Sequence, residues 1–432
     1  MRVLIVDSGG RGHALAWKVS QSSRLSKLFV APGNGGTQAL GENVPIKVTD
    51  IPELLKFVED KKIDFTIASQ DDSLALGIVD DFTAHGHKIF GPTKFAARIE
   101  SSKSFAKRAM KSAGVPTAPF RIFTSYDGAR DYVRKHGVPI VLKASGLALG
   151  KGAYVCKTVE AAEEALAEIM VKRIHGDAGN VVVIEDFLEG PEVSIHALCD
   201  GKDYVMFPSS QDHKPAFDAD LGPNTGGMGT ISPLPWILPA TMEEVGNRVV
   251  KPILKELTHL GVSFTGCLYP GLKMTPSGMA VLEFNARPGD PEIQSYMRLL
   301  DADLLEVLEA CADGTLSKVK DKVKWRPGYA ATIVMASGGY PGSYKKGLAI
   351  SGIDVAERIP GVVVFHAGTN VSDNALRTSG GRVLDVTAVG NTLKDALNTA
   401  YSAVACIDFE GKQWRTDIGN KSLAMAKAMA HS

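Results

Sequence analysis

The stretch Val281-Leu-Glu283-Phe-Asn285-Ala-Arg287-Pro-Gly-Asp290-Pro-Glu292 joins an apolar strand to alternating acidic, amide and basic residues. Successive side chains of a strand point to opposite faces, so Glu283, Asn285 and Arg287 share one face. Carboxylate and amide oxygens suit Mg²⁺ held together with substrate phosphates, and a neighbouring arginine suits a carboxylate or a phosphate. The pattern indicates a metal–nucleotide site. The alternative is a sheet edge with a solvated polar face.

Size and composition indicate a globular protein with more than one domain. The 432 residues are 44% hydrophobic and 22% charged, which is ordinary for folded chains with a substantial core. Lys+Arg and Asp+Glu both number 48, so no overall basic field exists to hold nucleic acid or an anionic membrane. We therefore expect neither partner, and we expect local groups to hold any anionic ligand.

Cysteine usage and the N-terminus point to a reducing compartment. The five cysteines are scattered without CxxC spacing, which fits neither a zinc site nor a disulfide framework. Met1-Arg2 leads directly into an apolar strand, and no window approaches 18 uncharged apolar residues. We expect reduced thiols and a cytoplasmic protein.

The order of strand-like and helix-like segments predicts an α/β protein in three parts. Residues 1–100 alternate strands with helices, as in a parallel sheet with crossovers. A helix at 101–113 opens the second part, in which a small α+β lid at about 120–190 precedes longer strands with irregular loops at 192–298. A third unit starts at residue 329, so the predicted domains are 1–100, 101–328 and 329–432.

A glycine-rich turn, Ser8-Gly9-Gly10-Arg11-Gly12-His13, follows the first strand and opens a helix. Glycines let the N–H groups of a helix N-terminus approach an anion. The second strand ends in Val30-Ala-Pro-Gly-Asn34, without the acidic residue that a dinucleotide-binding site places there. We therefore expect a phosphate-bearing small substrate at Gly9, Gly10 and Arg11. A tight turn without a ligand is the alternative.

A second glycine-rich segment follows Lys143, which ends a predicted strand, and contains Lys151 between two glycines. Lysines supply point charges to phosphates, and glycines permit close approach. The GxxxxGK[ST] order is missing, so the segment is not a Walker A loop and indicates another kind of ATP site. The strand and bend at 184–188 could read adenine through the backbone, and Glu192 could accept both hydroxyls of a ribose.

These features together resemble the ATP-grasp superfamily of carboxylate-amine ligases. More narrowly, seven ordered motifs across the whole chain look like those of the glycinamide ribonucleotide synthetase (phosphoribosylamine–glycine ligase) family. The motifs are Ala31-Pro-Gly-Asn-Gly-Gly36, Phe90-Gly-Pro-Thr93, Ser210-Gln-Asp-His-Lys214, Gly222-Pro-Asn-Thr-Gly-Gly-Met-Gly229, Gly289-Asp-Pro-Glu292, Ala336-Ser-Gly-Gly-Tyr-Pro-Gly342 and Phe365-His-Ala-Gly-Thr369. The resemblance implies an α/β ATP-grasp fold with an N-terminal parallel α/β (pre-ATP-grasp) domain, a small α+β lid and a C-terminal α+β domain.

The resemblance also implies roles for individual residues in holding ATP and Mg²⁺, or Mn²⁺ in its place. The nucleotide-binding residues would be Lys103, Lys143 and Lys151 at the phosphates, Glu185 and Phe187 at the adenine, and Glu192 at the ribose. The metal ligands would be Glu283 and Asn285.

A further set would face the two acceptor substrates. The resemblance gives catalytic roles to Arg287, Lys143, Asp212 and Lys214, and substrate-binding roles to Gly9, Gly10, Arg11, His213, Gly226, Gly227 and Asp290. In the family, ATP phosphorylates the glycine carboxylate, and the amine of 5-phosphoribosylamine then displaces the phosphate. This chemistry needs positioning and charge neutralisation and no covalent protein nucleophile. We expect small-molecule partners only, and a monomer or a small homo-oligomer.

Departures from the family's usual motifs lie mostly on the acceptor side. Asp7 and Gly12 stand where the family has glycine and glutamate, Gln70 and Asp71 lie where it has Gly-Pro-Glu, Ser145 replaces aspartate, and Pro288 replaces phenylalanine. A site that hydrogen-bonds a substrate discriminates strongly when one partner changes. Two alternatives therefore stay open: a paralogue that ligates a different amino acid or amine, and a non-catalytic nucleotide-binding homologue.

Overall fold

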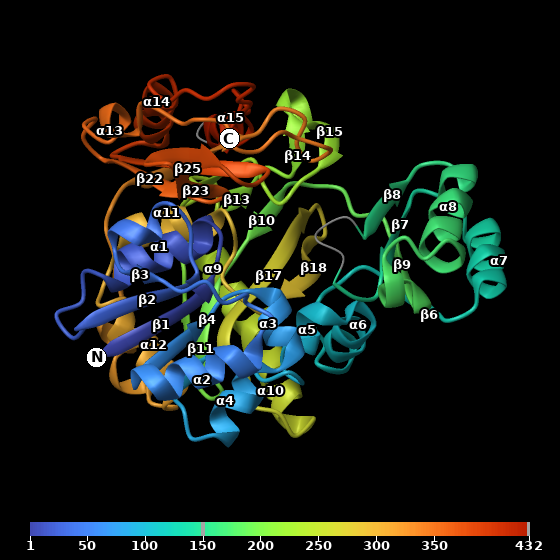
Figure 1. Cartoon of the computed structure of the whole chain (residues 1–432). Coiled ribbons are helices and arrows are strands. Elements are labelled where there is room, and N and C mark those ends of the chain that lie inside the picture. Colours follow the sequence, from blue (N-terminus) through green and yellow to red (C-terminus); the bar gives the residue numbers. More distant parts are fainter. Residues whose placement is uncertain (148–151, 430–432) are drawn as a thin grey trace.

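The computed structural model describes residues 1–147 and 152–429 (Figure 1). Its first unit is a five-stranded parallel sheet in the order β3-β2-β1-β4-β5, which confirms the predicted parallel sheet. The elements of this unit are β1 (Arg2–Asp7), α1 (Gly10–Val19), β2 (Lys27–Pro32), β3 (Glu42–Asn43), α2 (Ile51–Lys61), β4 (Phe65–Ala68), α3 (Asp71–Leu76), α4 (Ile78–Ala84) and β5 (Ile89–Phe90). The central strand β1 is fully buried from Val3 to Val6, as expected for a strand covered on both faces.

A small unit lies to one side of the molecule and has a hydrophobic core of its own (Figure 1). Its antiparallel sheet has the order β6-β9-β7-β8. Its elements are β6 (Phe120–Phe123), α7 (Tyr126–His136), β7 (Ile140–Ala144), β8 (Ala153–Cys156), α8 (Val159–Leu166) and β9 (Val182–Asp186). Two short helices, α5 (Arg98–Ser101) and α6 (Lys103–Ser112), connect it to the first unit. We refer to residues 120–186 as the lid.

The segment after the lid contains helices as well as strands. Its sheet has the order β10-β17-β11-β12, and β18 pairs with β17 in a hairpin. The strands are β10 (Glu192–Ser194), β11 (Ala197–Asp200), β12 (Tyr204–Met206), β17 (Thr265–Thr275) and β18 (Gly278–Asn285), and the helices are α9 (Pro239–Val245), α10 (Lys251–His259), α11 (Glu292–Leu299) and α12 (Leu304–Ala312). The helices α9 and α10 were not predicted, because Gly246 and Pro252 interrupt the helical pattern in the sequence.

The C-terminal sheet combines strands from distant parts of the chain. Its order is β13-β16-β21-β25-β22, so two strands from before residue 329 belong to it. The elements are β13 (Gln211–Asp212), β16 (Gly229–Ser232), β21 (Tyr329–Ala336), β22 (Val362–His366), β25 (Arg382–Gly390), α13 (Ile353–Ala356), α14 (Leu393–Val404) and α15 (Asn420–Met429), with the small hairpins β14 (Pro215–Phe217)–β15 (Leu221–Asn224) and β23 (Thr369–Ser372)–β24 (Ala375–Thr378). The division into three domains remains a proposal.

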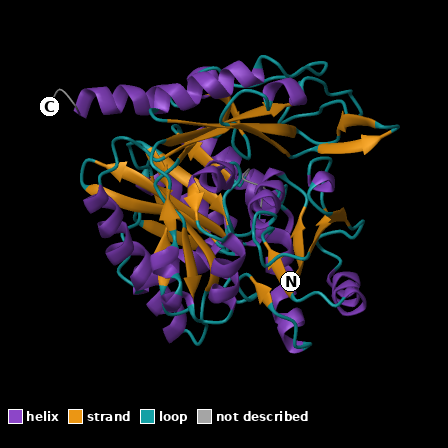
Figure 2. Cartoon of the chain, turned by 90° about the vertical axis from the view of Figure 1, so that its left-hand side faces the viewer, coloured by secondary structure: helices purple, strands orange, loops and turns teal. Residues whose placement is uncertain are grey.

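Two helices pack against the C-terminal sheet. α14 packs on β21 and β25 from above, and α11 packs on the same strands from below (Figure 1). Figure 2 shows the helices of this unit running along the outer face of the sheet. α11 begins at Glu292, shortly after β18 and Asp290. The C-terminal sheet therefore lies close to the polar residues at 283–292.

Candidate active site

The polar end of β18 forms the centre of the site. Glu283 Oε2 lies 3.0 Å from the Nζ of Lys103, the first residue of α6. This lysine holds the pKa of Glu283 at about 2, so the carboxylate is ionised at neutral pH. Asn285 Oδ1 accepts a hydrogen bond from Arg287 Nη2 at 3.4 Å. Glu283, which is partly exposed, and Asn285 alternate along β18 as expected, whereas Arg287 lies beyond the end of the strand and contacts Asn285 from there.

A buried ion cluster lies beside this row, where the lid meets the body. Glu185 Oε2 is 2.9 Å from Lys107 Nζ and 3.2 Å from Lys143 Nζ. Lys143 Nζ also donates to the carbonyl of Leu282 at 2.9 Å. Burial lowers the pKa of Lys107 to about 8, despite the attraction of Glu185. The Glu185 side chain thus pairs with two lysines through Oε2, and its other oxygen, Oε1, is buried without a hydrogen-bond partner among the described residues. Its expected role at the adenine remains a prediction.

Arg287 is held by an acidic residue from the end of the first unit. Its Nε lies 3.2 Å from Glu100 Oε1, and Glu100 Oε2 accepts the N–H of Ala286 at 2.8 Å. Pro288, one of the departures from the family pattern, offers its carbonyl to Arg287 Nη1 and to Arg11 Nη1, both at 3.2 Å. Two arginines from different units therefore converge on one carbonyl beside β18.

Asp212 and Lys214 form an ion pair in which only the lysine is accessible. The side chain of Lys214 is 40% exposed, whereas that of Asp212 is 2% exposed. Burial raises the pKa of Asp212 to about 6. Glu292 lies in the same network and accepts hydrogen bonds from Tyr269 at 2.6 Å and Ser194 at 3.1 Å. The side chain of Lys214 can therefore reach a ligand, and the buried carboxylate of Asp212 holds that lysine in position.

His213 does not fit the substrate-binding role expected from its motif. Its Nδ1 bonds to the carbonyl of Gly229 at 3.0 Å, and its Nε2 accepts the N–H of Gly419 at 3.1 Å. With both ring nitrogens engaged, the buried ring ties β16 to the C-terminal segment and has no polar atom left for a substrate. The neighbouring Gly226 and Gly227 lie in the loop that precedes β16.

The glycine-rich turn at the start of α1 is present but is partly filled by the protein's own carboxylate. Asp7 Oδ1 accepts the N–H of Gly9 at 2.7 Å, and Asp7 Oδ2 accepts from Arg11 Nε at 2.8 Å. Ser69 Oγ donates to the same Oδ2 at 2.7 Å. The N–H groups of the first turn beyond Gly9 have no side-chain cap and remain suited to an anion.

Asp7 also explains Gly12, because the side chain of Asp7 fills the space that a side chain at residue 12 would need. A Cβ on residue 12 would lie 2.6 Å from the Cβ of Asp7. We expect Gly12→Ala to lower the free energy of unfolding by about 1–3 kcal/mol through this overlap. Asp7→Gly should relieve the overlap, so in thermal unfolding the double variant should lose less than the sum of the single losses.

Gly128→Ala is the matched control, since a Cβ there meets no atom closer than 3.8 Å and the position is helical. Its unfolding temperature should stay level or rise. Strictly additive losses in the Asp7 and Gly12 cycle would contradict a shared space.

The remaining predicted positions are spread around the lid. Phe187 follows β9 and is half-buried, and Glu192 begins β10 with its carboxylate 3.1 Å from Lys273 Nζ. Lys151 lies outside the described residues. Ser145 accepts the N–H of Ser104 at 3.0 Å, which links the start of the glycine-rich segment to α6.

Some residues of the cluster were missed by sequence reasoning. Lys107 could have been found, because it lies four residues after Lys103 and therefore on the same face of α6. Gln294, Arg382 and Asp385 had no such signal. Gln294 Nε2 donates to Asp290 Oδ1 and to Asp385 Oδ2, both at 2.8 Å, and Arg382 Nη2 donates to Asp290 Oδ2 at 3.0 Å.

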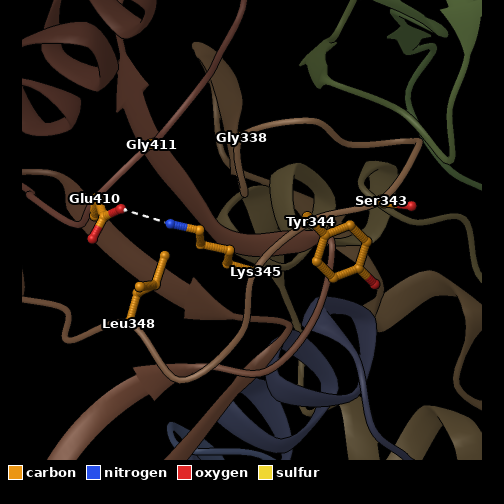
Figure 3. A pocket seen from close by; sticks show the side chains of 7 residues that line it. All are labelled: Gly338, Ser343, Tyr344, Lys345, Leu348, Glu410 and Gly411. Atoms are coloured by element: carbon orange, nitrogen blue, oxygen red, sulfur yellow. Dashed lines mark hydrogen bonds and ion pairs between the residues drawn. The ribbon is translucent and has the colours of Figure 1, made fainter.

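A separate hollow of about 470 Å³ lies on the C-terminal unit and is shown in Figure 3. Lys345 and Glu410 form an ion pair across it at 3.4 Å. It is lined by Gly338, Ser343, Tyr344, Lys345, Leu348, Glu410 and Gly411. None of the predicted site residues that the structure describes contributes to it, so the candidate site remains the cluster around β18.

The chain matches the sequence models of one family along most of its length. Residues 1–100 match the N domain of phosphoribosylglycinamide synthetase, residues 101–293 its ATP-grasp (A) domain, and residues 330–421 its C domain. Within the described residues, no helix is long and apolar enough to cross a membrane.

Individual relatives agree with this match. The chain is 46% identical to a phosphoribosylamine–glycine ligase from Chlorobaculum tepidum and 44% identical to one from Vibrio cholerae, covering 98% and 99% of this chain and all of each relative.

Solved structures show the same fold. A phosphoribosylamine–glycine ligase from Thermotoga maritima superposes with a TM-score of 0.83 at 31% identity, covering 96% of this chain and all of that one. A biotin carboxylase from Campylobacter jejuni, 14% identical with a TM-score of 0.75, covers all of this chain and 95% of its own, and shows the fold alone. The expected ATP-grasp architecture is confirmed, and the chain belongs to the phosphoribosylglycinamide synthetase family.

Proposed function

We propose that the protein is an ATP-dependent ligase that joins glycine to 5-phosphoribosylamine and yields glycinamide ribonucleotide, ADP and phosphate. The observation that carries the proposal is the row Glu283, Asn285 and Arg287 beside Lys103 and Lys143. This row combines metal-type oxygens with cations for phosphates on one surface. The full-length similarity to phosphoribosylamine–glycine ligases supports the same choice of substrates.

The donor set suits Mg²⁺ better than a metal held by protein alone. Glu283 is ionised at neutral pH and 38% exposed, and Asn285 adds an amide oxygen. No group of three or more His, Cys, Asp or Glu within residues 1–147 and 152–429 could hold a metal ion. Two protein oxygens completed by phosphate oxygens are what Mg²⁺ prefers, and Mn²⁺ could take the same place. A bound Mg²⁺ would neutralise charge on the transferred phosphoryl group.

The lysines would act on ATP by position and charge. Lys103 is paired with Glu283, and Lys143 with Glu185, so each ammonium is held near the end of β18 before the nucleotide arrives. Phosphoryl transfer requires in-line alignment and stabilisation of spreading negative charge. These two lysines supply that charge, and the expected backbone contacts of Glu185 and Phe187 with adenine would set the distance.

The second half of the reaction would use the cations across the site. Arg287 and Lys214, whose side chain is 40% exposed, suit the glycine carboxylate and the acyl phosphate formed from it. The amine nitrogen of phosphoribosylamine then attacks the acyl carbon, the carbon–oxygen bond to phosphate breaks, and the nitrogen loses a proton. Asp290 lies where its carboxylate could receive that amine, beside Gly9 of the first turn.

The test is ADP release by the purified protein with ATP, Mg²⁺, glycine and phosphoribosylamine generated in situ. Turnover should require both acceptors, and Lys143→Met should abolish it because one of the two phosphate-binding charges is lost. Lys157→Met is the matched control, since this lysine is exposed on the lid beyond β8. Turnover with a different amino acid or amine, but not with this pair, would assign the departures to a changed acceptor site. ATP binding without any turnover would favour a non-catalytic homologue.

A further inference from the structure

The start of β25 contains an irregularity that changes which side chains face the site. β25 pairs with β21 in regular antiparallel register from Gly390 to Leu384, which lies opposite Met335. The next pair joins Ala336 to Arg382, so Val383 is an extra residue and forms a bulge. A bulge of this kind bends the strand and re-aims the side chains beside it.

The bulge brings Arg382 and Asp385 to the same group of residues. Three positions apart, they would point to opposite faces of a regular strand. In the structure, Arg382 Nη2 donates to Asp290 Oδ2 at 3.0 Å, while Asp385 Oδ2 accepts from Gln294 Nε2 at 2.8 Å. The same Gln294 Nε2 donates to Asp290 Oδ1 at 2.8 Å, so both residues act on Asp290.

Asp290 is therefore held at both of its carboxylate oxygens. Its side chain remains 13% exposed, whereas that of Asp385 is buried. Arg382 also donates through Nη1 to the carbonyls of Gly226, at 3.0 Å, and of Asp290, at 2.8 Å. One guanidinium thus links the Gly226 loop to Asp290, and a fork of five donors is the group best suited to this.

Asp385 also packs against Gly10 in the glycine-rich turn. A Cβ on residue 10 would lie 1.8 Å from Asp385 Oδ2 and 2.7 Å from Gln294 Nε2. The turn can approach Asp385 this closely only because residue 10 is glycine. The other oxygen of this buried carboxyl, Oδ1, has no hydrogen-bond partner among the described residues. The bulged strand therefore contacts both the glycine-rich turn and Asp290, which are the two parts of the expected acceptor site.

We propose that Arg382 and Asp385 are positioning residues that hold Asp290 in place for the amine acceptor, so that the C-terminal unit determines how well that acceptor binds. The inference rests on the proposed function. Asp290 would accept an N–H of the incoming amine, and Arg382 and Gln294 would keep the carboxylate oriented by occupying one lone pair on each oxygen.

The test compares Michaelis constants in the full-length protein. In Arg382→Gln, the KM for phosphoribosylamine should rise at least about tenfold, because a charged hydrogen bond to Asp290 is lost. The KM values for ATP and glycine should stay within about twofold of the wild type. Arg358→Gln is the matched control, since Arg358 lies in the same unit with its side chain 78% exposed.

Asp385 provides a second test that does not depend on the first variant. Asp385→Asn keeps the shape and the acceptor for Gln294, so its KM for the amine should stay within about threefold of the wild type. Asp385→Ala removes the acceptor and should resemble Arg382→Gln. Equal changes in all three KM values, a fall in kcat alone, or an Asp385→Asn variant as impaired as Asp385→Ala would overturn the proposal.

Failure of the proposed function would look different from failure of this inference. A wild-type protein that uses another amine would refute phosphoribosylamine as the acceptor, and the same KM comparison would then be made with that amine. A wild-type protein that is silent with every amine would refute both. A wild-type protein active with phosphoribosylamine, with an Arg382→Gln variant that keeps its KM, would refute the inference alone.

Discussion

Replacing Glu283 by glutamine is expected to lower kcat by at least about a hundredfold, because the ionised metal ligand on β18 is lost. Glutamine keeps the size of the side chain but not its charge. The substitution also leaves Lys103 without its partner at 3.0 Å, so this ammonium is free to attract a nucleotide phosphate. The variant should therefore still bind ATP in the absence of Mg²⁺, while the gain in affinity that Mg²⁺ gives the wild type should disappear.

Two measurements check this expectation. Titration of ATP with and without Mg²⁺ separates nucleotide binding from metal binding, and ADP release gives kcat. Glu244→Gln is the control, because Glu244 lies on a helix with its side chain 46% exposed. Within residues 1–147 and 152–429, its only ion pair is with Arg248. If Glu283→Gln kept a wild-type response to Mg²⁺, the metal would have to be placed elsewhere.

Local patterns in the sequence predicted the parts of the site that lie on one regular element. Strand alternation predicted that Glu283, Asn285 and Arg287 share one face. Glu283 and Asn285 lie on β18, whereas Arg287 lies two residues beyond its end and reaches back to Asn285 Oδ1. The parallel N-terminal sheet was predictable for the same reason, because most of its strands are followed by a helix at close range. Period and spacing contain this information without any long-range contact.

Long-range pairing and irregular backbone could not be predicted in this way. The strands β13 and β16 join the C-terminal sheet from about a hundred residues away, and nothing in their own composition indicates that partner. The bulge at Val383 reverses the expected facing of Arg382 relative to Asp385, so strand alternation would have separated two residues that act together. The family pattern at residues 7 and 12 showed a difference, but only the structure shows that the two positions share space.

The buried histidines lead to the second large effect, a loss of stability in mild acid. Burial lowers the pKa of His13 and His196 from 6.5 to about 3, and that of His213 and His366 to about 4. The geometry agrees, because ring nitrogens of His13, His196 and His213 accept backbone N–H groups at 2.7, 3.0 and 3.1 Å. A protonated nitrogen cannot accept a hydrogen bond. The unfolded chain therefore binds protons below about pH 6.5 that the folded protein does not, and stability falls with pH.

Two carboxyl groups oppose this trend. Burial raises the pKa of Asp212 to about 6 and that of Asp385 to about 7, so the folded protein binds protons there that the unfolded chain does not, and stability rises as pH falls. At about 1.4 kcal/mol per pH unit and proton, four histidines against two carboxyls give a net loss of about 4 kcal/mol between pH 6.5 and pH 5.

Thermal unfolding across this range should show the midpoint falling steadily. His13→Asn, which keeps an acceptor for the N–H of His366, should reduce the slope, whereas His259→Asn at an exposed position should not. A midpoint that does not change between pH 6.5 and pH 5 would mean that the folded protein accepts these protons without cost.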